Sequence, residues 1–344
     1  MTPAHGRDGG PARRVLAAVL DDYQQAAVRY GPWSQVESEV ELHCFQDHLS
    51  DRRALIERLE PFEVVCLMRE RTPLDAALID ALPNLKLIVT TAMWNASLDV
   101  AHAVRRGIVV SGTQSIQSGT PELTWLLVLA LARRFEAETA SVRSGGWQTS
   151  VGVDLRKRTI GLLGLGTIGV RVAKVADAFG MRVLAWSQNL TRERAAEAGA
   201  EYVDRDTLLR DSDFVSLHLR LSARTRHLIG ARELALMKPQ AFLVNTSRGP
   251  LVDERALIDA LVAGRIAGAG LDVFDVEPLP PDHPLRRLPN VVALPHVGYV
   301  TEAGYRLFFT QIVEAIRAWL DGHPIRRLIT DGTDAVPPPN EVPR

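Results

Sequence analysis

Three polar residues in the second half of the chain are of the types that carry hydride-transfer chemistry. Arg248, Glu277 and His296 follow the apolar runs at residues 241–246, 267–273 and 291–294. A guanidinium group matches a carboxylate with an adjacent carbonyl, and an imidazole can donate a proton near neutral pH. A carboxylate beside the imidazole favours its charged form. The set predicts reduction of a 2-oxo acid, with Arg248 binding the substrate and His296–Glu277 as the acid/base pair.

A glycine-rich turn predicts the cofactor for that chemistry. The apolar run at 160–163 leads into Gly164-x-Gly166-x-x-Gly169, where the last two glycines enclose Thr167 and Ile168, and a helical pattern follows at 170–179. In this strand–turn–helix context the motif binds a dinucleotide, with the pyrophosphate at the start of the helix. Taken singly, an arginine in a loop or a buried histidine is more often structural. Their joint occurrence at strand ends favours a nicotinamide-dependent enzyme.

The apolar runs that must position these residues predict two α/β domains with parallel sheets, because they are continuous rather than alternating. Strands are expected first at 15–20, 40–45, 63–68, 85–90 and 108–111, and then at 159–164, 182–186, 213–218, 241–246, 267–273 and 291–294. The second set has the size of a doubly wound Rossmann nucleotide-binding domain. We expect that domain at 114–301, and a flavodoxin-like substrate domain made of both chain ends, 13–113 plus 302–329. Residues 1–12 and 330–344 are expected to be flexible tails.

The apolar segment that begins at Pro121 predicts a buried helix with Thr120 as its N-cap. Residues 123–131 are apolar almost all round, and one protomer has difficulty covering such a helix. We therefore expect a homodimer that pairs through this helix.

Composition narrows the function further. The 344 residues carry a net charge of −1 with dispersed basic residues, which argues against nucleic acid as a partner. No apolar run is long enough to span a membrane, and the N-terminus lacks a secretory pattern. Two cysteines cannot form a disulfide framework, which suits the cytoplasm. The nine histidines do not cluster at metal-ligand spacing, so no metal site is expected. The expected partner is a small-molecule 2-oxo or 2-hydroxy acid.

Five segments together resemble the D-isomer-specific 2-hydroxyacid dehydrogenase family, which includes glyoxylate/hydroxypyruvate reductases, 3-phosphoglycerate dehydrogenases and D-lactate dehydrogenases. They are GLLGLGTIG, SLHLRLSARTRHLIG, MKPQAFLVNTSRGPLVDERAL, AGLDVFDVEPL and LPHVGY, and the resemblance runs from about residue 15 to about 328. It implies that the catalytic Arg, Glu and His are Arg248, Glu277 and His296. It also implies two domains, with both chain ends in the substrate domain, and pairing of subunits through the Pro121 helix.

The resemblance further implies which residues line the cofactor cleft. Asp272 is expected near the nicotinamide amide. The other residues assigned to the cofactor, beyond the glycine turn, are Ser187, Gln188, His218, Leu219, Thr246 and Gly298.

The chain departs from the family pattern at two places. Ser187 stands where an acidic residue would bind the adenosine ribose, so a 2′-phosphate is no longer repelled. Arg192 and Arg194 follow and are candidates to bind it, although a solvated position in the first turn of the next helix explains each of them slightly better. NADP and NAD therefore both remain open as the cofactor.

The second departure is in the substrate-domain loop, where the family usually carries glycines. Here the loop reads Ala92-Met93-Trp94-Asn95, and its backbone amides are expected to hold the substrate carboxylate. Met93, Trp94 and Asn95 predict a pocket shaped for an unusual acid. Arg69, at another strand end, is a further substrate-binding candidate, with a structural salt bridge as the alternative.

Two other functions fit the same residues. The first is a nicotinamide-sensing binding protein of the corepressor type with little or no turnover, because fold does not determine function. The second is an enzyme acting on formate or phosphite. That reaction forms no alkoxide that must be protonated, so the presence of the Arg–Glu–His set makes this function less favoured.

Overall fold

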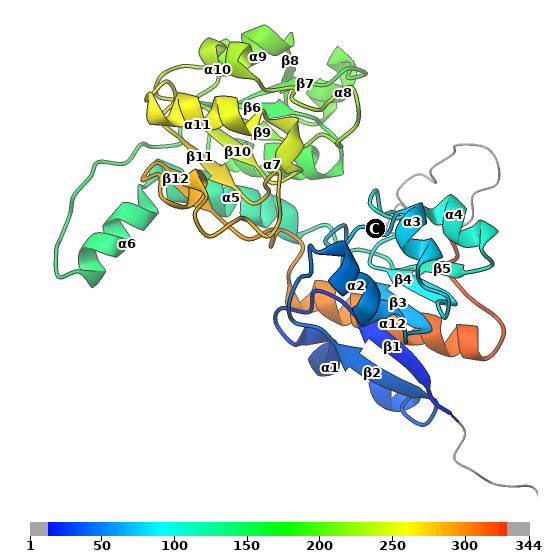
Figure 1. Cartoon of the computed structure of the whole chain (residues 1–344). Helices are drawn as coiled ribbons and strands as arrows, with labels where there is room; N and C mark the ends of the chain where they lie inside the picture. Colours follow the sequence, from blue (N-terminus) through cyan, green and yellow to red (C-terminus); the bar gives the residue numbers. More distant parts are fainter. Residues whose placement is uncertain (1–12, 329–344) are drawn as a thin grey trace, which may run out of the picture. The chain divides into compact units, whose positions relative to one another are not determined.

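The computed structural model describes residues 13–328, so the predicted tails at 1–12 and 330–344 lie outside the described residues. The described chain forms two compact units. Unit 1 contains residues 13–116 and 302–328, and unit 2 contains Gln117–Thr301 (Figure 1). The chain therefore passes from unit 1 to unit 2 after residue 116 and returns after residue 301. Both units are α/β structures with parallel sheets, as the continuous apolar runs predicted.

Unit 1 is built on a five-stranded parallel sheet in the order β2-β1-β3-β4-β5. The strands are short and three of them are almost entirely buried, because helices pack on both faces. The strands are β1 (Val15–Val19), β2 (Val40–Cys44), β3 (Val64–Leu67), β4 (Leu87–Thr90) and β5 (Val109–Gly112). The helices between them are α1 (Ala26–Tyr30), the 3-10 turn η1 (Trp33–Gln35), α2 (Arg52–Leu59), α3 (Ala76–Asp80) and α4 (Val100–Arg105).

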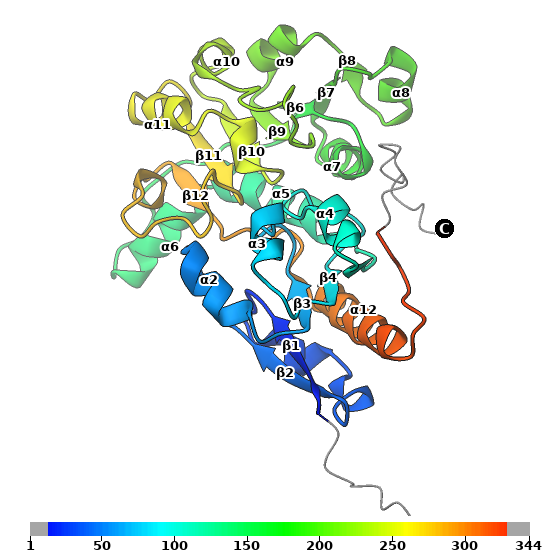
Figure 2. The ribbon, with the colours of Figure 1, turned by 45° about the vertical axis from the view of Figure 1, so that its right-hand side comes forward.

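The last helix, α12 (Glu302–Leu320), completes unit 1. It lies beside β4 (Figure 2) and also contacts β5 and α1. Its buried face includes Phe308, Phe309 and Ile312. The C-terminal segment of the described chain also returns to β5, where Leu328 N–H donates to the carbonyl of Val110. Unit 1 is thus a discontinuous unit that needs both ends of the sequence for its core.

Unit 2 is built on a seven-stranded parallel sheet in the order β12-β11-β10-β9-β6-β7-β8. Six of its strands were expected: β6 (Thr159–Leu163), β7 (Arg182–Trp186), β9 (Phe214–Leu217), β10 (Phe242–Asn245), β11 (Gly268–Leu271) and β12 (Val291–Ala293). The seventh, β8 (Glu201–Tyr202), was missed because two residues carry no periodic signal. Its helices are α7 (Thr167–Ala178), α8 (Arg192–Glu197), α9 (Arg205–Asp211), α10 (Ala231–Leu236) and α11 (Glu254–Val262), with 3-10 turns η2 (Gly249–Leu251) and η3 (Pro284–Arg286).

Unit 2 opens with the apolar helix α5 (Gly119–Ala132), which corrects one expectation. The helix begins at Gly119 with Ser118 in the N-cap position, so Thr120 is not the N-cap. The Thr120 hydroxyl instead donates to the carbonyl of Gly298, a tertiary contact that takes its capping oxygen away from the helix end. Most of α5 is buried against β10, β11, β12 and α7, but the side chains of Leu126 and Leu129 are 53% and 38% exposed.

Helix α6 (Phe135–Arg143) follows α5 and extends away from the unit 2 sheet, together with the loop that leads to β6 (Figure 1). None of its residues is buried. No helix in residues 13–328 has the length and apolar character needed to cross a bilayer.

Candidate active site

The glycine turn of unit 2 has the geometry of a phosphate-binding loop. Gly164 has φ of +107°, and a Cβ there would lie 2.6 Å from the carbonyl oxygen of His218. A Cβ at Gly169 would lie 2.2 Å from the Gly164 carbonyl, so only glycine lets α7 start this close to β6. In contrast, the Cβ position of Gly166 faces open space, and no side chain caps the first turn of α7. The turn therefore presents backbone amides where a pyrophosphate group would fit.

His296 and Glu277 form a close pair at the carboxyl edge of this sheet. The Nδ1 atom of His296 lies 2.6 Å from Oε2 of Glu277, and both side chains are mostly buried. Glu277 Oε1 accepts a hydrogen bond from the backbone N–H of Phe274 at 2.9 Å. The backbone of His296 is left-handed, with φ of +53°, and its ring packs edge-on against Tyr299. Because Nδ1 faces the carboxylate, Nε2 is the nitrogen left to face a ligand.

Asp272 holds the segment that carries His296. Its two carboxylate oxygens accept hydrogen bonds from the backbone N–H groups of Val297 and Gly298, each at 2.8 Å. Burial raises the pKa of Asp272 to about 6, against the lowering effect of these two hydrogen bonds. The expectation from the resemblance placed Asp272 near the nicotinamide. The structure adds this anchoring contact, which the sequence pattern did not indicate.

Arg248 lies at the same edge of the sheet. Asn245, Leu271 and Ala293 are in register across β10, β11 and β12, so the segments that follow them leave the sheet side by side. The turn that carries Arg248 is held by Asn245, whose side chain donates to the Arg248 carbonyl and accepts from Ser247 N–H. The Arg248 guanidinium is half-buried and donates to the Ser247 carbonyl at 2.7 Å.

Gly249 brings the Arg248 and Glu277 segments into direct contact. A Cβ at Gly249 would lie 2.1 Å from the backbone of Phe274 and 2.6 Å from the backbone nitrogen of Asp275. Only glycine permits this approach, which fixes the position of one segment against the other. Thr246, on the same turn, has its hydroxyl 2.9 Å from that of Thr124 on α5.

The far end of the expected cofactor cleft lies beyond β7. Ser187 is half-buried and Gln188 is exposed at the carboxyl end of that strand. Arg192 and Arg194 are exposed in the short helix α8, and the guanidinium of Arg192 lies 5.4 Å from the centre of the Tyr202 ring.

His218 directly follows β9, beside the glycine turn. Its Nε2 atom lies 3.0 Å from the hydroxyl of Ser216, and burial lowers the pKa of His218 to about 4. Its imidazole is therefore neutral at physiological pH. Leu219, the next residue, accepts a hydrogen bond from the Ser247 hydroxyl through its carbonyl.

In unit 1 the segments after β3 and β4 lie next to each other, since Leu67 and Thr90 are in register. Arg69 has a left-handed backbone with φ of +54°, and its N–H donates to the Thr91 hydroxyl at 2.7 Å. Its guanidinium nitrogen Nε lies 3.7 Å from Glu70, so the salt bridge considered from the sequence is present as a loose contact.

The loop after β4 is held by Asn95. This side chain is 5% exposed, and its amide nitrogen donates to the Arg69 carbonyl and the Thr90 hydroxyl. Its amide oxygen accepts from Ser97 N–H. Trp94, in contrast, is 41% exposed. Asn95 therefore shapes the loop from inside, whereas Trp94 is available to a ligand.

Residues 125–298 match the family described as D-isomer specific 2-hydroxyacid dehydrogenase, NAD binding domain. The chain belongs to this family. Among curated relatives, a glyoxylate reductase from Korarchaeum cryptofilum is 38% identical over 315 residues, which are 89% of this chain and 94% of that protein. A glyoxylate reductase from Thermococcus litoralis is 41% identical over 278 residues, 77% of this chain and 83% of that protein.

A solved structure agrees with this assignment. The crystal structure of a phosphoglycerate oxidoreductase from Vibrio cholerae O395 has a TM-score of 0.85 and 37% identity, and it covers 90% of this chain and 99% of that one. This member of the D-2-hydroxyacid dehydrogenase family is thus an NAD(P)-dependent oxidoreductase acting on a small-molecule acid, as the motifs predicted. The relatives carry enzyme names, which favours the dehydrogenase over the corepressor alternative. No group of three or more His, Cys, Asp or Glu within residues 13–328 is arranged to hold a metal ion.

Proposed function

We propose that this dehydrogenase reduces a small 2-oxo acid to the D-2-hydroxy acid, or oxidises the latter, with Arg248, Glu277 and His296 as the reacting set. The observation that carries the proposal is the 2.6 Å contact between His296 Nδ1 and Glu277 at the carboxyl edge of the nucleotide-binding sheet. The edge of an open parallel sheet is where ligands bind.

In the direction of reduction, His296 supplies the proton. Glu277 holds Nδ1–H, so the proton on Nε2 can pass to the carbonyl oxygen of the substrate as that oxygen gains negative charge. Arg248 binds the carboxylate and carbonyl of the substrate and polarises the carbonyl. When bound, the reduced nicotinamide supplies the hydride. Glu277 stabilises the charged imidazole before transfer, and oxidation runs through the same groups in reverse.

The cofactor is assigned to residues that converge on the glycine turn. Backbone amides at Gly164, Gly166, Thr167, Ile168 and Gly169 would hold the pyrophosphate. The nicotinamide end is assigned to Thr246, Asp272 and Gly298, and the remaining contacts to Ser187, Gln188, His218 and Leu219. The open space at Gly166 and the uncapped start of α7 support this assignment.

Cofactor choice is proposed to favour NADPH. Ser187 provides no carboxylate to repel a 2′-phosphate, and Arg192 and Arg194 are exposed just beyond it. Measuring kcat/KM with NADH and NADPH separately tests this. A strong preference for NADH would reject it, and Ser187→Asp is expected to reverse a preference for NADPH.

Unit 1 is proposed as the substrate domain. The backbone amides of the loop that contains Met93, Trp94 and Asn95 would bind the substrate carboxylate, with Arg69 adding positive charge. Trp94 is the exposed member of the loop and is proposed to contact the substrate side group. Asn95 contributes by holding the loop in shape.

A screen of 2-oxo acids is the direct test of this function. Glyoxylate, hydroxypyruvate, pyruvate and bulkier analogues are assayed with each cofactor by the loss of absorbance of the reduced nicotinamide. The names of the relatives favour glyoxylate. The absence of turnover on every acid, with NADH bound, would favour the sensor function instead.

Arg248→Lys sharpens the test, because lysine keeps the charge but cannot bind a carboxylate with two parallel hydrogen bonds. We expect kcat/KM to fall by roughly a hundredfold, with both KM and kcat affected. Arg265→Lys, at an exposed position in unit 2, is the matched control and should leave both constants unchanged.

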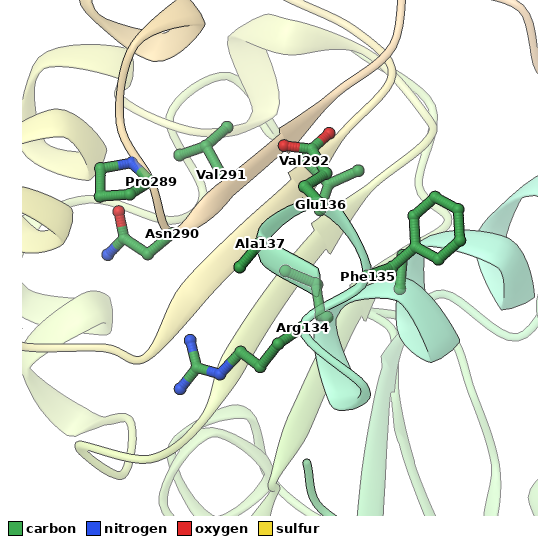
Figure 3. Close-up of a pocket in the computed structure, with 10 residues that line it drawn as sticks. Arg134, Phe135, Glu136, Ala137, Pro289, Asn290, Val291 and Val292 are labelled. Carbon is green, nitrogen blue, oxygen red and sulfur yellow. The ribbon is translucent and has the colours of Figure 1, made fainter. Parts of the chain in front are cut away.

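The protein is also proposed to form a homodimer through α5, α6 and the loop that follows. Large apolar side chains gather there and are exposed: Leu126, Leu129, Phe135, Val142, Trp147 and Val151. A small hollow lies beside them, between Arg134–Ala137 at the start of α6 and Pro289–Val292 at the start of β12 (Figure 3). An apolar surface of this extent on one chain is typical of an interface, and its continuity over two helices favours a second copy of the same chain.

The mass in solution tests this pairing. Leu126→Glu is expected to convert a dimer to a monomer, as measured by light scattering. Val28→Glu, a change at an equally exposed apolar residue of unit 1, should leave the dimer intact. A monomeric wild-type chain would reject the proposal.

Both cysteines, Cys44 in β2 and Cys66 in β3, are unpaired. Free thiols of this kind favour a reducing compartment, and we propose the cytoplasm on this ground. Localisation of the tagged protein in its native cells is the test.

A further inference from the structure

The loop that carries Glu277 lacks regular secondary structure between residues 272 and 283. A general acid/base pair nevertheless requires its carboxylate to be held in place, because a displacement of about 1 Å is enough to cost a large part of the rate. The internal contact of Glu277 with Phe274 N–H fixes the side chain relative to the loop, but it does not fix the loop relative to the sheet. Contacts from outside the loop do so, and the packing of Gly249 against the Phe274–Asp275 peptide is one of them.

One side chain outside the loop binds both of its ends. Oε2 of Glu254 accepts a hydrogen bond from the backbone N–H of Asp275 at 3.3 Å. Oε1 of the same carboxylate lies 3.1 Å from Nε2 of His283, and both of these side chains are mostly buried. Asp275 and His283 lie on either side of Glu277 in the sequence, so the carboxylate closes the loop around it.

Glu254 is itself well placed to act as an anchor. It is the first residue of α11, and the preceding residue, Asp253, caps that helix by accepting from Ala256 N–H. The segment that precedes α11 begins with Arg248 and Gly249, and Gly249 packs against the Phe274–Asp275 peptide. Glu254 and Gly249 therefore tie the Arg248 segment and the Glu277 loop together at two points.

We propose that Glu254 is a positioning residue of the dehydrogenase, which sets the place of Glu277 and through it the protonation of His296. The inference rests on the acid/base role proposed above for the His296–Glu277 pair. Glu254 binds neither substrate nor cofactor in this proposal. Its effect passes through the closed loop, which keeps the Glu277 carboxylate on Nδ1 of His296.

Several charged groups surround the Glu254 carboxylate. His283 pairs with it, and the Asp253 and Asp275 carboxylates are its acidic neighbours. Burial raises the pKa of Asp275, and the Glu254 charge raises it further, against the lowering effect of His227 and Arg226. Titration of Asp275 could therefore contribute to the pH dependence of kcat/KM. Measuring that pH dependence again in an Asp275→Asn background removes this contribution.

The test compares Glu254→Ala and Glu254→Gln with Asp259→Ala. Asp259 is on the same helix and pairs with Arg255 at the exposed surface, so its variant is the matched control. We expect Glu254→Ala to lower kcat roughly tenfold, to move the pH midpoint of kcat/KM for reduction downward, and to leave the binding of the preferred reduced cofactor and the substrate KM unchanged. Glu254→Gln keeps an acceptor for Asp275 N–H, so its effect should be smaller. Asp259→Ala should have none.

A double-mutant cycle decides whether Glu254 acts through Glu277. If it does, Glu254→Ala added to Glu277→Gln lowers kcat little beyond Glu277→Gln alone. Full additivity, or a pH profile that does not move in Glu254→Ala, overturns the proposal while the role of Glu277 stands. A Glu277→Gln enzyme with unchanged kcat and pH profile overturns both.

His283→Asn keeps the proposal testable if Glu254→Ala fails to fold. Asparagine can still cap η3 by accepting from Leu285 N–H, as His283 does, but it is too short to reach Glu254. One end of the loop is then released while the contact with Asp275 remains. We expect the same downward movement of the pH midpoint, smaller in size, and an unchanged midpoint would contradict the inference.

Discussion

The carboxyl edges of the two sheets are built with different anchors. In unit 2, carboxylates hold the segments that carry the proposed acid/base pair: Asp272 binds two backbone amides after His296, and Glu277 binds both His296 and Phe274 N–H. In unit 1, the segments after β3 and β4 are held mainly by neutral groups, Asn95 and the Thr91 hydroxyl, while the buried carboxylate of Asp21, after β1, accepts a hydrogen bond from the Thr72 hydroxyl. Proton transfer needs negative groups that stabilise a charged imidazole. Recognition of an anionic substrate is favoured where the side chains that hold the proposed substrate loop, here Asn95 and Thr91, carry no charge.

The same comparison extends to the backbone. Arg69 and Ala92 in unit 1, and His296 in unit 2, all have positive φ just beyond strand ends. Left-handed backbone at a residue other than glycine costs free energy, and proteins retain it mostly at functional sites. Both edges therefore carry local backbone strain. They differ in the charge of the side chains that hold the strained segments in place. Four variants test this division between chemistry and recognition.

His296→Asn is expected to have the largest effect, because it removes the proposed proton donor. The kcat for reduction should fall at least about a hundredfold, with little change in cofactor affinity. The control is His43→Asn, since His43 also contacts a carboxylate, Glu41 at 3.2 Å, but on an exposed surface. Retention of wild-type kcat would remove His296 from the mechanism.

Arg69→Gln should act on recognition instead. Loss of the cation that is proposed to bind the substrate carboxylate is expected to raise KM by roughly tenfold and to leave the pH profile of kcat in place. Arg53→Gln, at an exposed Arg–Glu pair of the same unit, serves as the control. A fall in kcat without a change in KM would contradict the assignment of unit 1 to binding.

Trp94→Ala tests the shape of the pocket. Removing an indole that is 41% exposed should raise kcat/KM for bulky 2-oxo acids relative to glyoxylate, by about three- to tenfold. Trp94→Phe, which keeps an apolar ring, should change this ratio less. An unchanged ratio in both variants would place Trp94 outside the substrate pocket.

His218→Asn concerns stability and has the smallest effect. Burial lowers the pKa of His218 from 6.5 to about 4, so between these pH values the unfolded chain binds a proton that the folded chain does not. The free energy of unfolding therefore falls as the pH drops through this window, by up to about 1.4 kcal/mol per pH unit.

The asparagine variant lacks that titration, and its unfolding free energy should depend less on pH between 6.5 and 4. Denaturant unfolding at a series of pH values measures this. His323→Asn, at an exposed position, is the control and should keep the wild-type slope. Parallel slopes in His218→Asn and wild type would contradict the assignment.

Local patterns predicted most of the strands and the long helix α12, because a buried strand or an amphipathic helix leaves a periodic signal in a few consecutive residues. The two-residue strand β8 has no such signal, and the start of α5 was misplaced because the Thr120 hydroxyl binds Gly298, which is remote in sequence. The anchoring contacts of Asp272 and Glu254 were missed for the same reason. No pattern in the residues adjacent to Asp272 or Glu254 indicates which distant backbone group or side chain will bind the carboxylate.

By itself, the order of residues determined that this protein has a dinucleotide-binding turn and that Arg248, Glu277 and His296 stand at strand ends. Glycine spacing and apolar runs act over short distances, so they can be read along the chain. Only the tertiary structure decided that Glu277 lies 2.6 Å from His296 and that Glu254 closes the loop between them. Those contacts join segments 19 to 29 residues apart, and their geometry arises from how parallel strands align at one edge of a sheet.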